Sequence, residues 1–244
     1  TGQYSVKVTL PEEEEALGWS GFRVEEFVPN RLEADVDAPE GAWSAGQKVK
    51  FTAVARHLFG APAGGRHVEA RLQLVPETFA PDGWSDYVFS DPGRPFSPRD
   101  IEVGEGTLGE NGEKGFAAQV PDDLEPPSAL SARLSATVHE MGGRSVTALL
   151  DRMCHPYPRY VGLKKPDGHV APGTEAEIRC AAVRPDGQAV TDATVDITVY
   201  RVHWHSVLKK TARGGYRWVS RKEEREVKKS ECPIREGRGS VRFT

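Results

Sequence analysis

Two runs of alternating apolar and polar residues, joined by a corner rich in Gly, Pro and Ala, constrain the fold of this chain more than any other feature. They lie in VKFTAVARHLFGAPAGGRHVEARLQLV, residues 49–75. The apolar positions are Val49, Phe51, Ala53 and Ala55 before the corner, and Val68, Ala70, Leu72 and Leu74 after it. A spacing of two is that of a β-strand with one buried face. The stretch therefore predicts a strand, a turn and a second strand, in the manner of a β-hairpin.

The same pattern occurs a second time, 127 residues later. GQKVKFTAVARHLFGAPAGGRHVEARLQLV from Gly46 aligns without a gap with GTEAEIRCAAVRPDGQAVTDATVDITVYRV from Gly173. Identities are few, but glycines and apolar positions stay in phase, as Gly60 with Gly187 shows. A slip of one residue would exchange the two faces of each strand. A repeat of this length indicates a whole domain that occurs twice, not the short unit of a solenoid.

The repeat divides the chain into three parts. Residues 1–28 hold GQYSVKVTLP and GFRVEEF, and we expect them to be the closing strands of a preceding domain. Residues 29–152 form one complete unit, and residues 153–244 form a second, whose completeness the sequence leaves open. Both units have short strands at the spacing of an antiparallel β-sandwich. The predicted fold class is therefore all-β, with tandem fibronectin-like or immunoglobulin-like β-sandwiches.

Composition agrees with strands joined by turns. The chain has 25 Gly and 18 Pro among 244 residues, which is high for a helical protein. Only residues 220–230, SRKEEREVKKS, compete as a helix, through Glu224 and Lys228 at i,i+4. Because GGYRWV precedes this segment and ECPI follows it, we expect an exposed strand of a long hairpin there.

Charge and hydropathy exclude two classes of partner. The net charge is −4 and the isoelectric point is near 6.0, so no global basic field attracts nucleic acid or anionic lipid. No apolar run approaches the roughly 18 residues of a membrane span. The chain begins in mid-pattern at Thr1, and we interpret it as a piece of a longer protein. The lack of a signal peptide therefore says nothing about that protein.

Three cysteines, Cys154, Cys180 and Cys232, leave at least one without a partner in the chain. Cys180 alternates with Ile178 and Ala182, which favours a buried, unreactive thiol over a disulfide scaffold. A bridge between Cys180 and Cys232 stays open, because the spacing does not decide it.

Two motifs have the spacing of a ligand-binding site, one for a nucleotide and one for a metal, but a structural explanation fits each of them better. GEGTLG has the G-x-G-x-x-G spacing, at Gly104, Gly106 and Gly109, but no helix follows whose N-terminus would hold a pyrophosphate, and acidic residues surround it. We expect a surface loop. HWH places His203 and His205 on one side of a strand, yet no further ligand lies at motif spacing for zinc. We expect these two imidazoles to face solvent beside a buried Trp204.

Three further segments contain residues that sites often use. His57 and His67 flank the corner and would face each other across a hairpin, which chance explains better than a metal. Residues 12–15 are four consecutive Glu, expected in a solvated loop without a calcium motif. Residues 85–100, SDYVFSDPGRPFSPRD, form the most plausible contact surface of the first unit. The sequence thus predicts no catalytic residue, no cofactor or cofactor-binding residue and no metal ligand.

GFRVEEFVPNRL followed by AGQKVKFTAVARHLFGAPAGGRHVEARL resembles the macroglobulin (MG) domains of bacterial α2-macroglobulins. There a strand F-x-V-E-E-F-x-P-x-R leads into Y/H-L-F-G-A-P-A. The positions that fit are Phe22, Val24, Glu25, Glu26, Phe27, Pro29 and Arg31, then Leu58, Phe59, Gly60, Ala61, Pro62 and Ala63. In the second unit YPRYVGLK, DGQAV, VDITVYRVHW and GGYRWV are similar to the MG domain that follows.

This resemblance implies a non-catalytic part of the shell of a broad-spectrum protease inhibitor, a protease trap. The partners would be proteases, bound by the full-length protein, and neighbouring MG domains of the same chain. Domains of this kind would precede the bait segment that proteases cut. No C-x-E-Q thioester motif begins at any of the three cysteines. The resemblance also implies a periplasmic location, with a lipid anchor of the parent on the inner membrane and no direct membrane contact from these residues.

Two other classes of function compete. One is an immunoglobulin-like stalk or adhesin module of a bacterial surface protein, which a wall anchor or further identical repeats would indicate. The other is a carbohydrate-binding accessory domain, which needs an exposed row of aromatic side chains. The five tryptophans are instead scattered along the sequence, at Trp19, Trp43, Trp84, Trp204 and Trp218.

Overall fold

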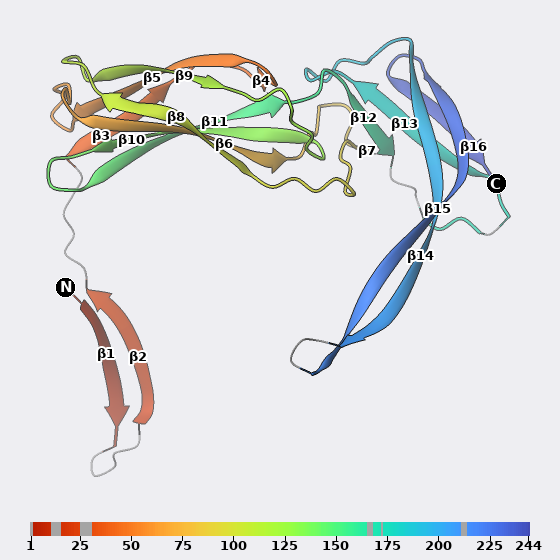
Figure 1. Ribbon diagram of the computed structural model, residues 1–244, viewed down its shortest axis with the longest axis horizontal. Coiled ribbons are helices and arrows are strands. Elements are labelled where there is room, and N and C mark those ends of the chain that lie inside the picture. Colours follow the sequence, from red (N-terminus) through yellow and green to blue (C-terminus); the bar gives the residue numbers. More distant parts are fainter. Residues whose placement is uncertain (1, 11–15, 25–30, 165–167, 172, 211–213) are drawn as a thin grey trace.

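The computed structural model describes residues 2–10, 16–24, 31–164, 168–171, 173–210 and 214–244, and they are built of β-strands (Figure 1). Since no helix occurs among them, none there is long and apolar enough to cross a lipid bilayer. The all-β prediction is confirmed. Residues 220–230 lie within strand β15 (Tyr216–Ile234), so the preference for a strand over a helix in this segment is confirmed as well.

The first unit is a β-sandwich. A three-stranded sheet of order β3-β5-β9 covers a five-stranded sheet of order β4-β11-β10-β6-β8. The strands are β3 (Leu32–Asp37), β4 (Trp43–Ser44), β5 (Lys48–His57), β6 (His67–Glu77), β8 (Arg99–Thr107), β9 (Glu113–Gln119), β10 (Ala129–His139) and β11 (Ser145–His155). All eight apolar positions predicted to face the core are buried between the sheets. β11 continues three residues beyond the end expected for this unit.

The prediction of a β-hairpin at residues 49–75 is wrong. β5 pairs with β3 and β9, whereas β6 pairs with β10 and β8, so the two strands belong to opposite sheets. A hairpin needs a short turn of matching twist, and residues 58–66 are long enough for the chain to cross from one sheet to the other instead. The alternation of apolar residues is the same in both arrangements, because either strand buries one face.

The corner between the two strands is repeated in the second unit. An isolated bridge joins Arg56 to Pro62 in the first corner, and a bridge joins Val183 to Ala189 in the second, 127 residues later. The sequence repeat is therefore a repeat of backbone structure. Both corners also contain a glycine with positive φ, +94° and +80°, a region that favours this residue: Gly60 and Gly187.

The second unit has a smaller sheet of order β16-β13-β12-β7. Three of these strands follow the junction, and the fourth, β7 (Tyr87–Val88), comes from the first unit. The others are β12 (Tyr160–Lys164), β13 (Ala176–Val183) and β16 (Arg238–Phe243). The core of this unit consists of Cys180, Ala182, Val190, Ile197, Cys232 and Ile234.

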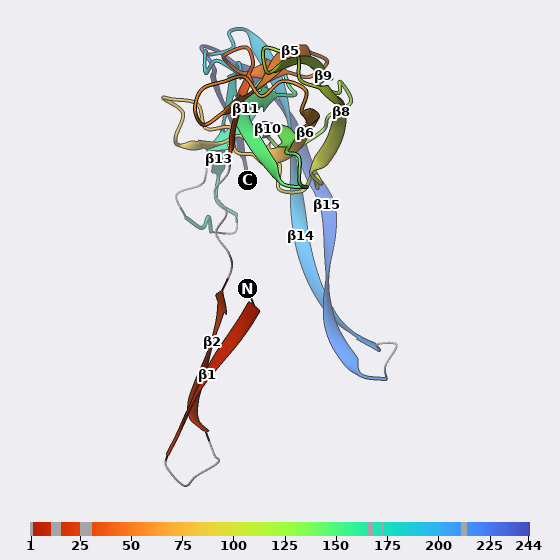
Figure 2. The ribbon, with the colours of Figure 1, turned by 90° about the vertical axis from the view of Figure 1, so that its left-hand side faces the viewer.

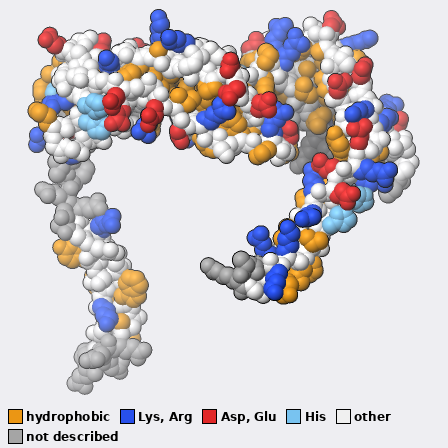
Figure 3. Space-filling view, viewed as in Figure 1, with side chains coloured by type: hydrophobic (Ala, Val, Ile, Leu, Met, Phe, Trp, Pro, Cys, Tyr) orange, Lys and Arg blue, Asp and Glu red, His pale blue; other side chains and the backbone are white. Residues whose placement is uncertain are grey.

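Strands β14 (Ala193–Lys210) and β15 form a long hairpin that leaves the body of the molecule (Figures 1 and 2). Trp204, expected in the core, is 67% exposed. The reason is that, from about Tyr200 onward, the described residues cover neither face of the hairpin. Hydrophobic side chains and Lys or Arg side chains both line this projecting part (Figure 3).

Strands β1 (Gly2–Thr9) and β2 (Ala16–Val24) form a separate antiparallel pair away from the sandwich (Figures 1 and 2). Their apolar side chains are exposed; Trp19, for example, is 78% accessible. Within the described part of the chain these two strands pair with each other alone. That they close a preceding domain stays a prediction.

Candidate functional site at the joint between the units

A loop of the first unit, residues 78–98, builds the joint to the second unit. Its strand β7 pairs with β12, so that Val88 lies opposite Leu163 and Tyr87 opposite Lys164. Asp86 accepts a hydrogen bond of 3.0 Å from the ammonium group of Lys164. The sequence singled out residues 85–100 as a contact surface, and in the structure this segment contacts the neighbouring unit through β7 as well as its own unit, for example through Phe89 and Ser128.

Aromatic side chains fill the joint. Phe79 is 6% exposed and stacks on Tyr160 of β12 with ring centroids 4.1 Å apart. The ring of Phe89 meets Phe79 edge-on at 5.6 Å. Gly162 makes this packing possible, because a Cβ there would lie 2.6 Å from the Phe89 ring. Such ring pairs stabilise contacts beyond the apolar area that they bury, by about 0.5–1.5 kcal/mol each.

Trp84 anchors the loop to the corner of the second unit. Its indole N–H donates a hydrogen bond of 3.0 Å to the carbonyl oxygen of Gly187, the glycine that the sequence repeat identified. The guanidinium group of Arg238 lies over the indole ring, 4.9 Å from the centroid. The side chain is 9% exposed. Its apolar ring is therefore buried at the joint, and its polar N–H group has a hydrogen-bond partner there.

Buried polar groups at the joint also have partners. The hydroxyl of Ser128 donates to the carbonyl oxygen of Phe89 at 2.6 Å and accepts from the amide of Phe79 at 3.1 Å. The hydroxyl of Tyr157 donates to the carbonyl oxygen of Pro126 at 2.6 Å. Hydrogen bonds of this kind fix one arrangement of the loop, because breaking any of them leaves a buried group without a partner.

His155 lies buried at the end of β11, where the two units meet. Its ring meets Phe79 edge-on at 5.4 Å, and its Nδ1 lies 3.0 Å from the hydroxyl of Tyr160. Burial lowers the pKa of His155 from its ordinary value of 6.5, because a charged imidazole is poorly solvated there. Burial likewise raises the pKa of Tyr160.

A dependence of stability on pH follows. Because the folded protein resists protonation of His155, the unfolded chain binds more protons as the pH falls below about 6.5, and the protein loses stability. The slope due to this group is at most about 1.4 kcal/mol per pH unit. We expect urea unfolding between pH 7.5 and 5 to show this loss, and the variant His155→Gln to show a flatter profile. His203→Gln, on the exposed hairpin, should keep the slope; a slope equal in both variants would contradict the assignment.

The histidine and glutamate motifs of the sequence lie away from the joint. His203 and His205 are exposed on β14, with stacked rings 6.4 Å apart, as expected of solvent-facing side chains. His57 stacks on Phe59 and does not face His67, because the two histidines belong to opposite sheets. The run of Glu at residues 12–15 lies outside the described residues.

The expectation of a surface loop at GEGTLG is wrong for Gly104 and Gly106 and is confirmed for Gly109, which lies in the exposed turn after β8. Gly104 and Gly106 lie within β8, and Gly106 pairs with Val68 of β6. Gly104 has a φ of +148° next to an irregularity of the β6–β8 register, which explains a glycine inside a strand. A strand follows this segment, so the helix N-terminus that a dinucleotide site needs is not formed by it.

Both units match known protein families, in a defined order along the chain. The family model described as the bacterial alpha-2-macroglobulin MG5 domain matches residues 30–156, and the model described as bacterial macroglobulin domain 6 matches residues 162–244. The chain belongs to the bacterial α2-macroglobulin family. The resemblance stated from the sequence motifs is thereby confirmed.

Individual relatives agree with this family. The alpha-2-macroglobulin of Xylella fastidiosa is 30% identical over 213 residues, which are 84% of this chain and 13% of that protein. The alpha-2-macroglobulin of Pasteurella multocida is 25% identical over 258 residues, covering 96% of this chain and 14% of that protein. The chain thus spans only about a seventh of the length of these relatives.

Solved structures show the same fold. Salmonella alpha-2-macroglobulin reacted with methylamine superposes with a TM-score of 0.67 at 20% identity, covering all of this chain and 17% of that one. The native conformation of the E. coli protein gives a TM-score of 0.65 at 19% identity, covering 95% of this chain and 16% of that one. At such identities the likeness concerns the fold alone.

Proposed function

We propose that this chain is a non-catalytic structural segment of a bacterial α2-macroglobulin-like protease inhibitor, and that it forms part of the shell of a protease trap. The observation that carries the proposal is the tandem of an MG5-like and an MG6-like unit in the order of the family. Its partners are neighbouring MG domains of the same chain and, through the full-length protein, proteases. A periplasmic location belongs to the same proposal.

The joint supports a mechanical role for this segment. Each unit has its own buried core, so it keeps its shape when its neighbours move. Trp84 and the ring pair of Phe79 with Tyr160 hold the two units together through buried contacts. A trap must change shape when its bait segment is cut, and rigid-body movement of packed units is one way in which proteins do so. In this proposal the two units move as one piece of the wall.

The test uses the full-length protein from which this chain comes. We expect that incubation with several unrelated proteases blocks most of their cleavage of a large protein substrate while hydrolysis of a small peptide substrate continues. The reason is that a shell excludes large substrates but leaves the active site of the enclosed protease free. A protease inactivated beforehand at its nucleophile is the control. It cannot cut a bait segment, so size-exclusion chromatography should show it separate from the inhibitor, whereas the active protease should elute with it.

The rival function gives a different result in the same experiment. A stalk or adhesin module leaves both activities unchanged, because it does not enclose the protease. Unhindered cleavage of the large substrate by every protease tested would contradict the trap.

A further inference from the structure

Three adjacent strands bring two histidines and two glutamates to one patch on the outer face of the five-stranded sheet. His67 and Glu69 lie on β6, two residues apart and therefore on the same face. Glu105 of β8 is paired with Glu69, on one side of β6. His139 of β10 lies on the other side, next to Val138, which is paired with Val68. The four side chains thus come from three strands that pair in the order β10-β6-β8.

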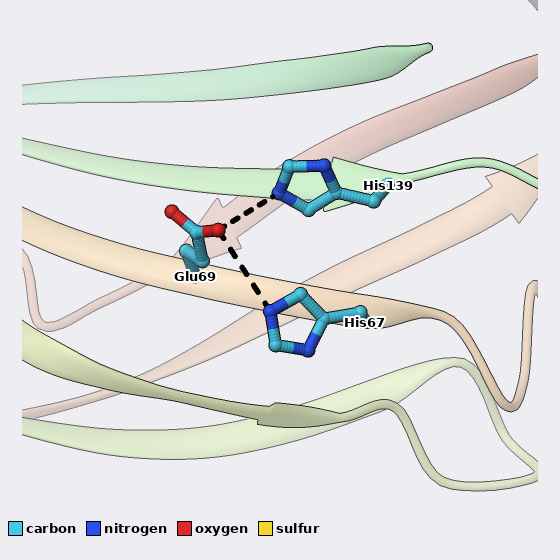
Figure 4. Close-up of side chains that lie close together, drawn as sticks. All are labelled: His67, Glu69 and His139. Atoms are coloured by element: carbon cyan, nitrogen blue, oxygen red, sulfur yellow. Dashed lines mark hydrogen bonds and ion pairs between the residues drawn. The ribbon is translucent and has the colours of Figure 1, made fainter. Parts of the chain in front are cut away.

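Ligand atoms converge within this patch. The Nε2 atom of His139 lies 3.1 Å from Oε1 of Glu69, and the Nε2 atom of His67 lies 3.8 Å from the same oxygen. Figure 4 shows both rings turned toward this carboxylate from neighbouring strands. The three ligand atoms all lie within 4.8 Å of one another. Oε2 of Glu105 adds a further oxygen, 3.6 Å from Nε2 of His67.

These separations suit a small tetrahedral ion. With zinc–ligand bonds of roughly 2.0–2.1 Å, two ligands of a tetrahedral site lie about 3.3 Å apart. The two distances to Glu69 fall on either side of this value, and no two of the three ligand atoms are more than 4.8 Å apart, so rotations about side-chain torsions would bring them to the spacing of the site. The exposed fractions of His67, Glu69 and His139 are 45%, 36% and 38%, which gives the side chains this freedom and gives an ion access.

We propose that His67, Glu69 and His139 bind a divalent transition-metal ion, of which zinc is the type, with Glu105 or water in the fourth position. Two imidazoles and a carboxylate form a donor set that suits zinc better than calcium or magnesium, which prefer oxygen ligands. Arg71 lies 3.9 Å from the other carboxylate oxygen of Glu69, so Oε1 stays available to the ion. The site would bind β6 to β10 and, through Glu105, to β8.

The other histidine pair of the chain offers no such site. The rings of His203 and His205 stack with centroids 6.4 Å apart, and Glu223 lies 3.0 Å from His205. Among the described residues, the group of three around Glu69 is the one whose His, Cys, Asp or Glu ligand atoms all come within 4.8 Å. The pair on β14 therefore serves as a matched control, with the same number of imidazoles in an exposed strand.

The test is zinc binding to the 244-residue chain after treatment with a chelator. We expect titration calorimetry with zinc chloride to give one ion per chain, and the midpoint of thermal unfolding to rise with zinc because the ion binds the folded state. The variants His139→Ala and Glu69→Gln should bind zinc about 100-fold more weakly or worse, since each removes a direct ligand. Glu105→Gln should have a smaller effect.

Two controls make the result decisive. The double variant His203→Ala/His205→Ala should bind zinc as the unaltered chain does. Cobalt(II) bound in place of zinc should show the visible absorption of a tetrahedral site without a thiolate charge-transfer band, which separates this site from the three cysteines. Circular dichroism checks that each variant is folded. Absence of one-to-one binding, equal binding by His139→Ala, or loss of binding only in the β14 variant would overturn the proposal, which does not depend on the trap.

Discussion

Trp84→Ala should destabilise the second unit and release the loop that joins the two units. The indole is 9% exposed, donates a hydrogen bond to Gly187 and packs against Arg238, so the variant loses apolar contacts and leaves a carbonyl group without its partner. Truncation of a buried aromatic side chain costs about 3–5 kcal/mol. We expect a lower denaturation midpoint for the second unit and faster cleavage by a protease that cuts before aspartate, at Asp86 and Asp91 of the released loop.

Two other tryptophans provide matched controls. Trp204 and Trp19 are 67% and 78% exposed, so replacing either by Ala removes the same side chain without opening a buried joint. Both control variants should keep the unfolding midpoint and the cleavage rate of the unaltered chain. If Trp84→Ala behaved like them, the loop would be held by its strand pairing with β12 alone, and the role assigned to the indole would be wrong.

Oxidative refolding should join Cys180 to Cys232. In the structure both are buried free thiols with their sulfur atoms 3.0 Å apart. Burial raises the pKa of Cys180, which suppresses the reactive thiolate in the folded protein, so the bond should form during refolding. With oxidised glutathione as the oxidant, the two thiols lose two hydrogen atoms and glutathione is reduced. A bridge between residues 52 positions apart would raise the free energy of unfolding of the second unit by about 4 kcal/mol.

Mass spectrometry and denaturant unfolding check this result. The refolded chain should be lighter by two hydrogen atoms, and a peptide map should show the 180–232 linkage. Cys154→Ala should not alter the outcome, because Cys154 belongs to the core of the first unit. Cys232→Ala should abolish both the mass change and the added stability. A chain that stays fully reduced after oxidative refolding, or a bridge without any gain in stability, would contradict the expectation.

Local patterns in the sequence were enough to predict much of the fold. Alternation of apolar and polar residues correctly predicted that the eight apolar positions between Val49 and Leu74 lie on buried faces of strands. A strand with one solvated face shows this period of two in any sheet. The repeat located the two corners, since Gly60 and Gly187 have backbone angles that favour glycine. The same patterns did not reveal that β5 and β6 lie in opposite sheets, because alternation carries no information about which strands pair.

Contacts between residues far apart in the chain could not be predicted from local patterns in the sequence. Trp84 is buried because Gly187 and Arg238, more than a hundred residues later, lie against it, whereas no described residue covers Trp204. The group around Glu69 was missed for the same reason. The sequence drew attention to His67 with His57, ten residues earlier, whereas its partner His139 comes from a strand that begins more than sixty residues later. Only the pairing of β6 with β10 brings the two imidazoles together.

The long hairpin of β14 and β15 has a mechanical consequence. From Tyr200 to Lys210, at ~3.3 Å per residue, the free part spans about 35 Å. Its base continues into strands whose side chains help to form the core of the second unit, so any rotation of that unit carries the hairpin with it. A rotation of ~15° would displace the tip by about 9 Å over this length. The hairpin is thus a lever arm that converts a small turn of a packed unit into a large excursion at its end.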